Sequence, residues 1–316
     1  MCLSKSLLLA LSTIALSLGL FSCSHNVHHS DMVYAYGTFW EVHLYEGKDE
    51  DLDEICDYIA ETSRVLDLEA SSVEDGLYAL NHLGQVNAHP FLIDALSLAL
   101  EMEKLTHGAF SYTVGDLTAS WLDALGHGVL LEEEIVVDLL QKSRQTSIKI
   151  ENESVIKTGE ATIDLGALGK GLCLKKIKAK LDQKGFTKYL INAGTSSILF
   201  GENTSKSGET RVEIDDAPGR YFYAKNGALS VSSNSRQSYI IDEWTYSHII
   251  DPRDGYPANN VDAVLLYGDD AAKLDALSTA YFVLGEEYAS ELEDMGYHVA
   301  MCKGGKVIYE SAGFLE

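Results

Sequence analysis

The stretch DLGALGKG, Asp164–Gly171, follows an apolar run and precedes a long segment with helical spacing. Glycines and a lysine at such a junction are typical of a turn that points backbone N–H groups and an ammonium toward one place. We therefore expect a strand, a glycine turn and a helix over 169–185 whose first turn carries Lys170. Neither a Walker A loop nor a dinucleotide fingerprint fits, because the glycine spacing differs from both patterns. A plain tight connection with a solvated Lys170 is the alternative.

The acidic composition limits the partners of this turn. The chain has 316 residues and a formal net charge of −24, with 46% hydrophobic and 23% charged residues. This balance is typical of a folded globular protein. So negative a surface disfavours nucleic acid and anionic membranes as partners. Any phosphate ligand must therefore be held by positive charge close to it.

The N-terminus has the pattern of an export signal. A lone lysine precedes an apolar run of fourteen residues, which is shorter than the roughly 20 residues needed to span a bilayer. The letters LFSC, ending at Cys23, resemble the lipobox of bacterial lipoproteins; an ordinary signal peptide with a chance cysteine is the alternative. We expect a signal peptide over 1–22, a lipid on Cys23, a tether over 24–31 and a domain over 32–316. The protein would then be exported and lipid-anchored to a membrane of the bacterial cell envelope.

The hydrophobic pattern predicts an α+β fold, a single mixed α/β domain without regular βαβ alternation. We expect one strand over 32–46, with Gly37 as a bulge. Further helices are predicted over 49–70, 91–106, 114–126, 131–143 and 269–285. The other strands and hairpins are predicted over 147–166, 188–194, 211–216, 221–226, 228–233, 238–250, 261–268 and 297–310. Residues 85–145 are a candidate helical subdomain.

Two further stretches carry side chains suited to chemistry. In SHIIDPRDGYP, residues 247–257, His248 ends a strand beside a turn made rigid by proline, where functional side chains are often displayed. A structural histidine is the alternative. In DDAAKLDALSTA, residues 269–280, Asp275 and Thr279 share one helix face. Their hard oxygens suit Mg²⁺, especially if the ion also meets phosphate, whereas the alternative is a solvated Asp275.

Seven motifs follow one another along the chain: YGTFW, LYALN, GAFSYTVGDL, IDLGALGKG, INAG, HIIDPRDGYP and DALSTAYFVLG. In this order they resemble the ApbE family, bacterial FAD:protein FMN transferases, over essentially the whole chain after the signal. The resemblance implies a domain that binds FAD and Mg²⁺, transfers the FMN half to a threonine hydroxyl of a partner flavoprotein, and releases AMP. It also implies an acceptor with a short S/T-G-A-S/T sequence, which this chain itself lacks.

Carried over position by position, the resemblance assigns the site. His248 is the catalytic histidine. The metal would be bound by the carbonyl of Ala167 and by Asp275, Thr279 and the nearby Ser278. The cofactor-binding residues would be Tyr36, Ala109, Phe110, Ser111, Asp164, Lys170 and Ile249. Ser111 stands where the family often has an acid and Tyr36 where methionine is usual, so this chain departs from the pattern at the expected FAD contacts.

These assignments reconcile the acidic chain with a phosphate ligand. A divalent ion recruited by Asp275, together with the Lys170 ammonium, would neutralise the diphosphate of FAD without any long-range basic charge. Either His248 or Asp164 would accept the threonine proton. The same residues would also serve an FAD pyrophosphatase that gives FMN and AMP, or a non-enzymatic FAD-binding lipoprotein.

Overall fold

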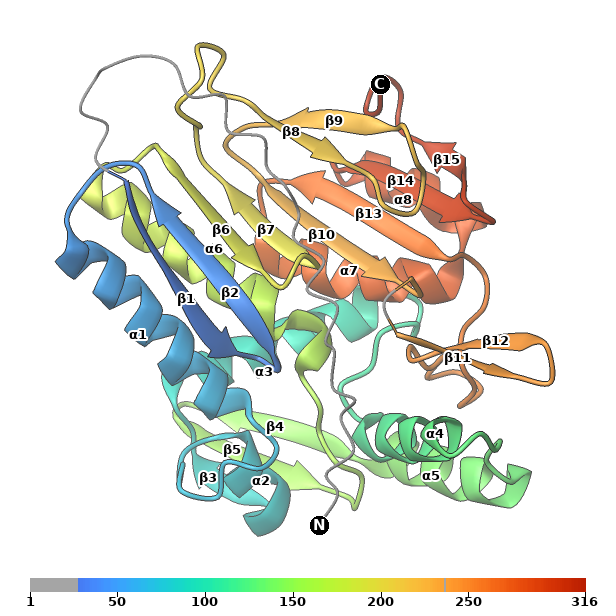
Figure 1. Ribbon diagram of the computed structural model, residues 1–316. Helices are drawn as coiled ribbons and strands as arrows, with labels where there is room; N and C mark the ends of the chain where they lie inside the picture. Colours follow the sequence, from blue (N-terminus) through green and yellow to red (C-terminus); the bar gives the residue numbers. More distant parts are fainter. Residues whose placement is uncertain (1–27, 236) are drawn as a thin grey trace, which may run out of the picture.

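An eight-stranded antiparallel sheet forms the centre of the part of the chain that the computed structural model describes, residues 28–235 and 237–316. Its strands, in order across the sheet, are β1 (His29–Ala35), β2 (Thr38–Leu44), β6 (Tyr189–Ala193), β7 (Ser197–Phe200), β10 (Ala228–Ser233), β13 (Ala263–Gly268), β14 (His298–Lys303) and β15 (Lys306–Glu310) (Figure 1). Sheet and helices intermingle along the chain, so the predicted mixed α/β architecture is confirmed.

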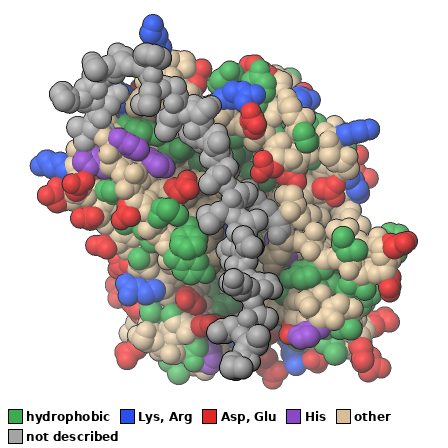
Figure 2. All heavy atoms as spheres, in the orientation of Figure 1, with side chains coloured by type: hydrophobic (Ala, Val, Ile, Leu, Met, Phe, Trp, Pro, Cys, Tyr) green, Lys and Arg blue, Asp and Glu red, His purple; other side chains and the backbone are tan. Residues whose placement is uncertain are grey.

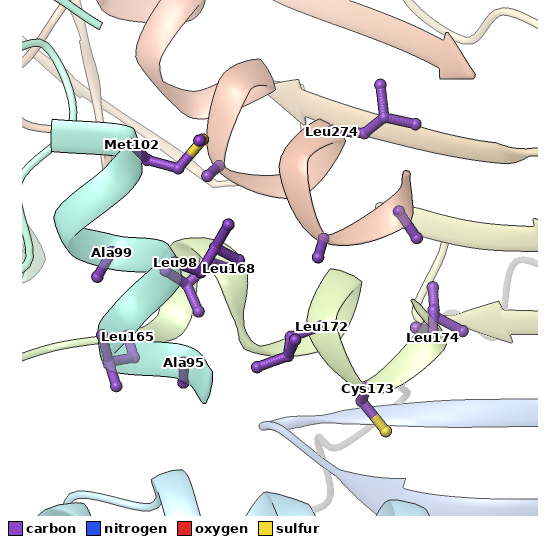
Figure 3. Close-up of a cluster of buried hydrophobic side chains, with 14 of the residues drawn as sticks. Ala95, Leu98, Ala99, Met102, Leu165, Leu168, Leu172, Cys173, Leu174 and Leu274 are labelled. Atoms are coloured by element: carbon purple, nitrogen blue, oxygen red, sulfur yellow. The ribbon is translucent and has the colours of Figure 1, made fainter. Parts of the chain in front are cut away.

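Helices cover one face of this sheet and enclose the main hydrophobic core. They are α1 (Asp49–Leu66), α3 (Pro90–Leu105), α6 (Gly166–Lys184) and α7 (Ala271–Leu284). Helix α7 is buried on nearly every side because it packs against the sheet, α3 and α6 at once. Figure 3 shows the junction of the three helices, where leucines of α6 face Ala95, Leu98 and Met102 of α3.

Smaller elements surround the sheet. The hairpin of β8 (Thr210–Glu213) and β9 (Tyr221–Ala224) contributes Phe222 to a second apolar cluster on the other face of the sheet. A three-stranded sheet is formed by β3 (Gln85–Asn87), β4 (Ser147–Glu151) and β5 (Ser154–Thr158), next to α2 (Leu77–Leu83). The last short helices are η1 (Glu286–Tyr288) and α8 (Ala289–Asp294).

The candidate subdomain over 85–145 does not form a unit. Helix α3 belongs to the main core, whereas α4 (Gly115–Gly126) and α5 (Glu133–Gln145) share a small cluster around Trp121 with Tyr239 and Tyr246. Those tyrosines belong to the hairpin of β11 (Ser238–Ile241) and β12 (Trp244–Ser247). Figure 2 shows acidic side chains scattered over one face of the molecule with fewer basic ones, as the composition predicts.

Two predictions for the N-terminal region need correction. The single strand expected over 32–46 is a hairpin of β1 and β2, because Tyr36 and Gly37 have φ values of 52° and 72° and reverse the chain. Two successive residues with positive φ make the tight turn whose twist suits an antiparallel hairpin. The boundary expected between the tether over 24–31 and the domain falls inside β1. The signal peptide and Cys23 lie outside the described residues, and none of the helices described is long and apolar enough to cross a bilayer.

The stretch DLGALGKG also differs from expectation. Residues 159–165 form no strand, and α6 begins at Gly166, so Lys170 lies in the second turn of the helix. Gly169 and Gly171 lie inside the helix and serve close packing, not a turn. A Cβ on Gly171 would collide with the carbonyl oxygen of Ala271 and lie 2.5 Å from the Cβ of Asp275. Helix α6 therefore contacts α7 more closely than any larger residue at 171 would allow.

Replacing Gly171 with alanine is expected to lower the free energy of unfolding by about 2–3 kcal/mol, because the added methyl overlaps the backbone of α7. Urea denaturation measures the change. Gly126→Ala is the matched control, since Gly126 is also helical but exposed, with nothing within 4 Å of an added Cβ. The control should be neutral or slightly stabilising. Equal effects from the two substitutions would contradict the packing role of Gly171.

Candidate functional site

The carboxylate of Asp275 lies at the centre of the candidate site. Asp275 is only 5% exposed. Its Oδ2 accepts the backbone N–H of Gly171 at 2.8 Å, and its Oδ1 accepts the hydroxyls of Ser197 at 2.8 Å and Ser230 at 3.2 Å. These three donors come from α6, β7 and β10. One side chain of α7 is thus fixed by three separate elements before any ligand is present.

A chain of hydroxyls continues from Asp275 along the contact between α7 and β10. Ser278 Oγ lies 3.0 Å from Ser230 Oγ and 2.9 Å from Ser232 Oγ. Ser232 Oγ in turn lies 3.1 Å from Thr279 Oγ1. The structure therefore brings Asp275, Ser278 and Thr279 together on one face of α7, as the helical spacing predicts.

Ala167 lies in the first turn of α6. In an α-helix the N–H of Gly171 would donate to the carbonyl of Ala167. Here that N–H donates to Asp275. The carbonyl of Ala167 therefore either shares the Gly171 N–H with Asp275 or has no donor in its own helix. An oxygen held less firmly by its own helix is better able to bind a cation.

The oxygens gathered here fit a hard divalent cation. A carboxylate, a hydroxyl and a carbonyl from Asp275, Thr279 and Ala167 are the ligand types that Mg²⁺ takes, together with water and phosphate. Among the described residues there is no group of three or more His, Cys, Asp or Glu that could hold a metal. A cation at this place would therefore depend on water or on a ligand's own oxygens for the rest of its coordination.

His248 follows β12 and is half-buried. Its Nδ1 donates to the carbonyl of Gln237 at 2.9 Å, because a carbonyl can only accept. In the neutral ring Nε2 then carries the lone pair. Burial lowers the pKa of His248, the Lys170 ammonium lowers it further, and the bond to Gln237 opposes both. The ring is therefore neutral near pH 7 and has a basic nitrogen at Nε2.

Lys170 lies within electrostatic reach of both His248 and Asp164. Burial raises the pKa of Asp164, against the opposing effects of the Gly166 N–H and the Lys170 ammonium. Asp164 Oδ1 accepts that N–H at 2.8 Å, at the start of α6. The described residues offer the Lys170 ammonium no hydrogen bond or ion pair. An unpaired ammonium beside a helix N-terminus suits an anionic ligand.

The predicted cofactor contacts on the segment GAFS take part in the internal packing. The side chains of Ala109 and Phe110 are buried in the main core. The Ser111 hydroxyl donates to the carboxylate of Glu103 at 3.0 Å. The N–H of Asp164 donates to the carbonyl of Tyr112 at 2.9 Å, so this segment does lie beside Asp164.

Tyr36 and Ile249 flank the site from two other elements. The Tyr36 ring approaches α6, since a Cβ on Gly169 would lie 3.1 Å from it. Its hydroxyl is buried beside Thr62 and Cys173. Ile249 is buried next to His248, and its N–H donates to the Ser247 hydroxyl at 2.9 Å. FAD contacts of these residues stay a prediction.

Sequence reasoning missed the serines that support the site. Ser197, Ser230 and Ser232 hydrogen-bond to Asp275, Ser278 or Thr279. The signal available was the alternation in ALSVSS, which places Ser230 and Ser232 on the same face of β10. This alternation becomes informative only once α7 is known to pack on that face of β10.

Sequence comparisons with known proteins identify the family of the chain. A family model described as the ApbE family matches residues 36–301. A Klebsiella pneumoniae (strain 342) protein named FAD:protein FMN transferase is 25% identical over 303 residues, covering 88% of this chain and 83% of that protein. A Treponema pallidum (strain Nichols) protein of the same name is 24% identical over 294 residues, covering 84% of this chain and 80% of that protein.

Solved structures show the same fold. The ApbE protein from Thermotoga maritima superimposes with a TM-score of 0.76 at 23% identity, over 90% of this chain and 97% of that chain. The flavin transferase ApbE from Vibrio cholerae gives a TM-score of 0.73 at 23% identity, over 91% of this chain and 97% of that chain.

The environment of His248 predicts how its ring titrates. Its pKa, followed by NMR, should lie below the ordinary value of about 6.5. Lys170→Met should raise it, because loss of a nearby positive charge makes protonation easier. Lys178→Met is the control, since Lys178 lies further along α6 and pairs with Asp182. A pKa that does not respond to Lys170→Met, or that moves equally in the control, would contradict this arrangement.

Proposed function

The chain belongs to the ApbE family, and on that premise we propose that it is a Mg²⁺-dependent FAD:protein FMN transferase. It moves FMN from FAD to a threonine hydroxyl of a partner flavoprotein, which carries an S/T-G-A-S/T type sequence, and releases AMP. The observation that carries this proposal is the Asp275 carboxylate bonded to the N–H of Gly171. This bond brings the helix that bears Lys170 and Ala167 against the helix that bears Thr279.

The diphosphate of FAD binds where these helices meet. The unpaired Lys170 ammonium and the N-terminal end of α6 attract its phosphate oxygens. Asp275, Thr279 and the Ala167 carbonyl would hold the Mg²⁺, which supplies charge neutralisation and Lewis acidity at the diphosphate when it is bound. This positive charge acts at short range, where the −24 net charge of the rest of the chain is largely screened.

His248 acts as the general base. Its Nε2 accepts the proton of the acceptor threonine, whose oxygen bonds to the phosphorus of the FMN half. The phosphorus–oxygen bond to the AMP half breaks, and AMP leaves with the bonding electrons. The tautomer fixed by Gln237 and the lowered pKa of His248 favour this role. Asp164 is the weaker candidate, because its carboxylate already accepts the N–H of Gly166.

The same protein is proposed to be exported and anchored to a membrane of the bacterial cell envelope through a lipid on Cys23. The supporting observation is the N-terminal pattern of an apolar run ending in LFSC. Because β1 begins at His29, the anchored domain would start a few residues after the modified cysteine.

Transfer is tested directly with purified protein, FAD, Mg²⁺ and an acceptor domain bearing such a threonine. Mass spectrometry of the acceptor should show one covalent FMN. EDTA should abolish the product, and His248→Asn should slow its formation at least about 100-fold because the base is lost. His127→Asn, at an exposed histidine after α4, should have no effect.

Two outcomes would contradict the transferase. Release of FMN and AMP at a comparable rate without acceptor would indicate a pyrophosphatase. Tight retention of intact FAD, with no product at any divalent metal tried, would indicate a flavin-binding lipoprotein.

The anchor is tested by expressing the full chain in a bacterium that processes lipoproteins. The unmodified chain should be found in the membrane fraction, and Cys23→Ser should lose the lipid and leave that fraction. Cys56→Ser, at a half-buried cysteine of α1, should stay with the membrane. A mature chain that carries no lipid mass would contradict the anchor.

A further inference from the structure

The face of β10 that packs on α7 carries two hydroxyl side chains after Ala228. Ser230 and Ser232 contact Asp275, Ser278 and Thr279 through their hydroxyls. Ser233 faces the other way, and its hydroxyl donates to Asp216 at 2.9 Å. The alternation of side chains along a strand therefore separates a site face from an outer face.

Asn234 is the first residue after β10. Its N–H donates to the carbonyl of Asp262 at 2.9 Å, which extends the pairing of β10 with β13 beyond the pair Ser233 and Ala263. The chain bends at Asn234 and Ser235, two residues after Ser232 and its contact with Thr279. Three residues later, Gln237 fixes His248 through its carbonyl. Asn234 thus lies on the segment that joins the Thr279 side of the site to the His248 side.

The side-chain oxygen of Asn234 is buried without a hydrogen-bond partner among the residues that the structure describes. The residue is only 8% exposed, and its Oδ1 has no hydrogen bond. Burying an unmet acceptor costs free energy, because the water that solvated it is lost and nothing replaces it. In a folded protein such an atom is explained when a ligand supplies the missing donor.

We propose that Asn234 is a nucleotide-binding residue whose Oδ1 accepts a hydrogen bond from an N–H or O–H donor of FAD. This assignment rests on the proposed function for the identity of the ligand. An amide acceptor cannot bind a phosphate oxygen, so the donor lies elsewhere on the nucleotide. The imide of the flavin, the amino group of adenine and the sugar hydroxyls are donors of this kind. Asn234 would favour a nucleotide that places one of these donor groups next to its Oδ1, away from the diphosphate.

A structural asparagine of the same chain provides the contrast. Asn81 donates from Nδ2 to the carbonyl of Ile163 at 2.9 Å and accepts the N–H of Ile163 at 2.8 Å, so both ends of its amide are bonded internally. Truncating Asn81 should destabilise the free protein. Truncating Asn234 removes an unmet acceptor, and the free protein should be as stable as before or more so.

The test measures melting temperature and nucleotide affinity of the whole domain with Mg²⁺. Asn234→Ala and the similarly sized Asn234→Leu should melt no lower than the unmodified protein without nucleotide, whereas Asn81→Ala should melt lower. Calorimetric titration with FAD should show a Kd about tenfold higher for both Asn234 variants, because the ligand donor is left unpaired. Parallel titrations with FMN and ADP identify the half that carries the donor, since only the half that contacts Asn234 should lose affinity.

Unchanged FAD affinity in both Asn234 variants would overturn the assignment while leaving the proposed function intact. A lower melting temperature without nucleotide, together with an unchanged gain on adding FAD, would make Asn234 structural and overturn it as well. An unmodified protein that binds none of the three nucleotides would overturn both the assignment and the proposed function.

Discussion

The hydrogen bond from the Gly171 N–H to the buried carboxylate of Asp275 is the contact on which the rest of the site depends. A charge in a protein interior is costly unless donors replace the water it loses. Here the donors come from α6, β7 and β10, so the carboxylate fixes the helix that bears Lys170 against the sheet. The absence of a side chain at 171 is what allows α6 and α7 to come close enough for this bond.

The proposed anion site is compatible with the acidic composition of the chain. Beyond about 8–10 Å, surface charges are largely screened at physiological salt, so the groups within that distance decide what is attracted. Near the start of α6 these are the Lys170 ammonium, which has no hydrogen bond or ion pair with the described residues, a helix N-terminus and oxygens suited to a hard cation. The many acidic side chains elsewhere are mostly exposed or paired with lysines, as Asp51 and Glu54 are with Lys184.

The sequence predicted structure correctly where a local pattern determines it. It was misleading where a residue distant in the sequence determines the local structure. Helical spacing places Asp275, Ser278 and Thr279 on one face, and the structure confirms it. The glycines of DLGALGKG suggest a turn, yet Gly171 is required by Ala271, a hundred residues later, and the sequence holds no sign of that pairing. The turn at Tyr36 was missed because an aromatic residue with positive φ is not a turn signal. Asn234 could not be recognised from the sequence, because only the folded structure shows that its Oδ1 is buried without a hydrogen bond to the described residues.

The central claim is that the junction of α6 and α7 binds a diphosphate together with a divalent cation. A crystal structure of the protein with ADP and Mn²⁺, with the metal located by its anomalous scattering, tests this most directly. The account predicts a Mn²⁺ peak bound by Asp275, Thr279 and the Ala167 carbonyl, with the diphosphate beside Lys170. A well-ordered nucleotide whose diphosphate and metal lie away from this junction would contradict it.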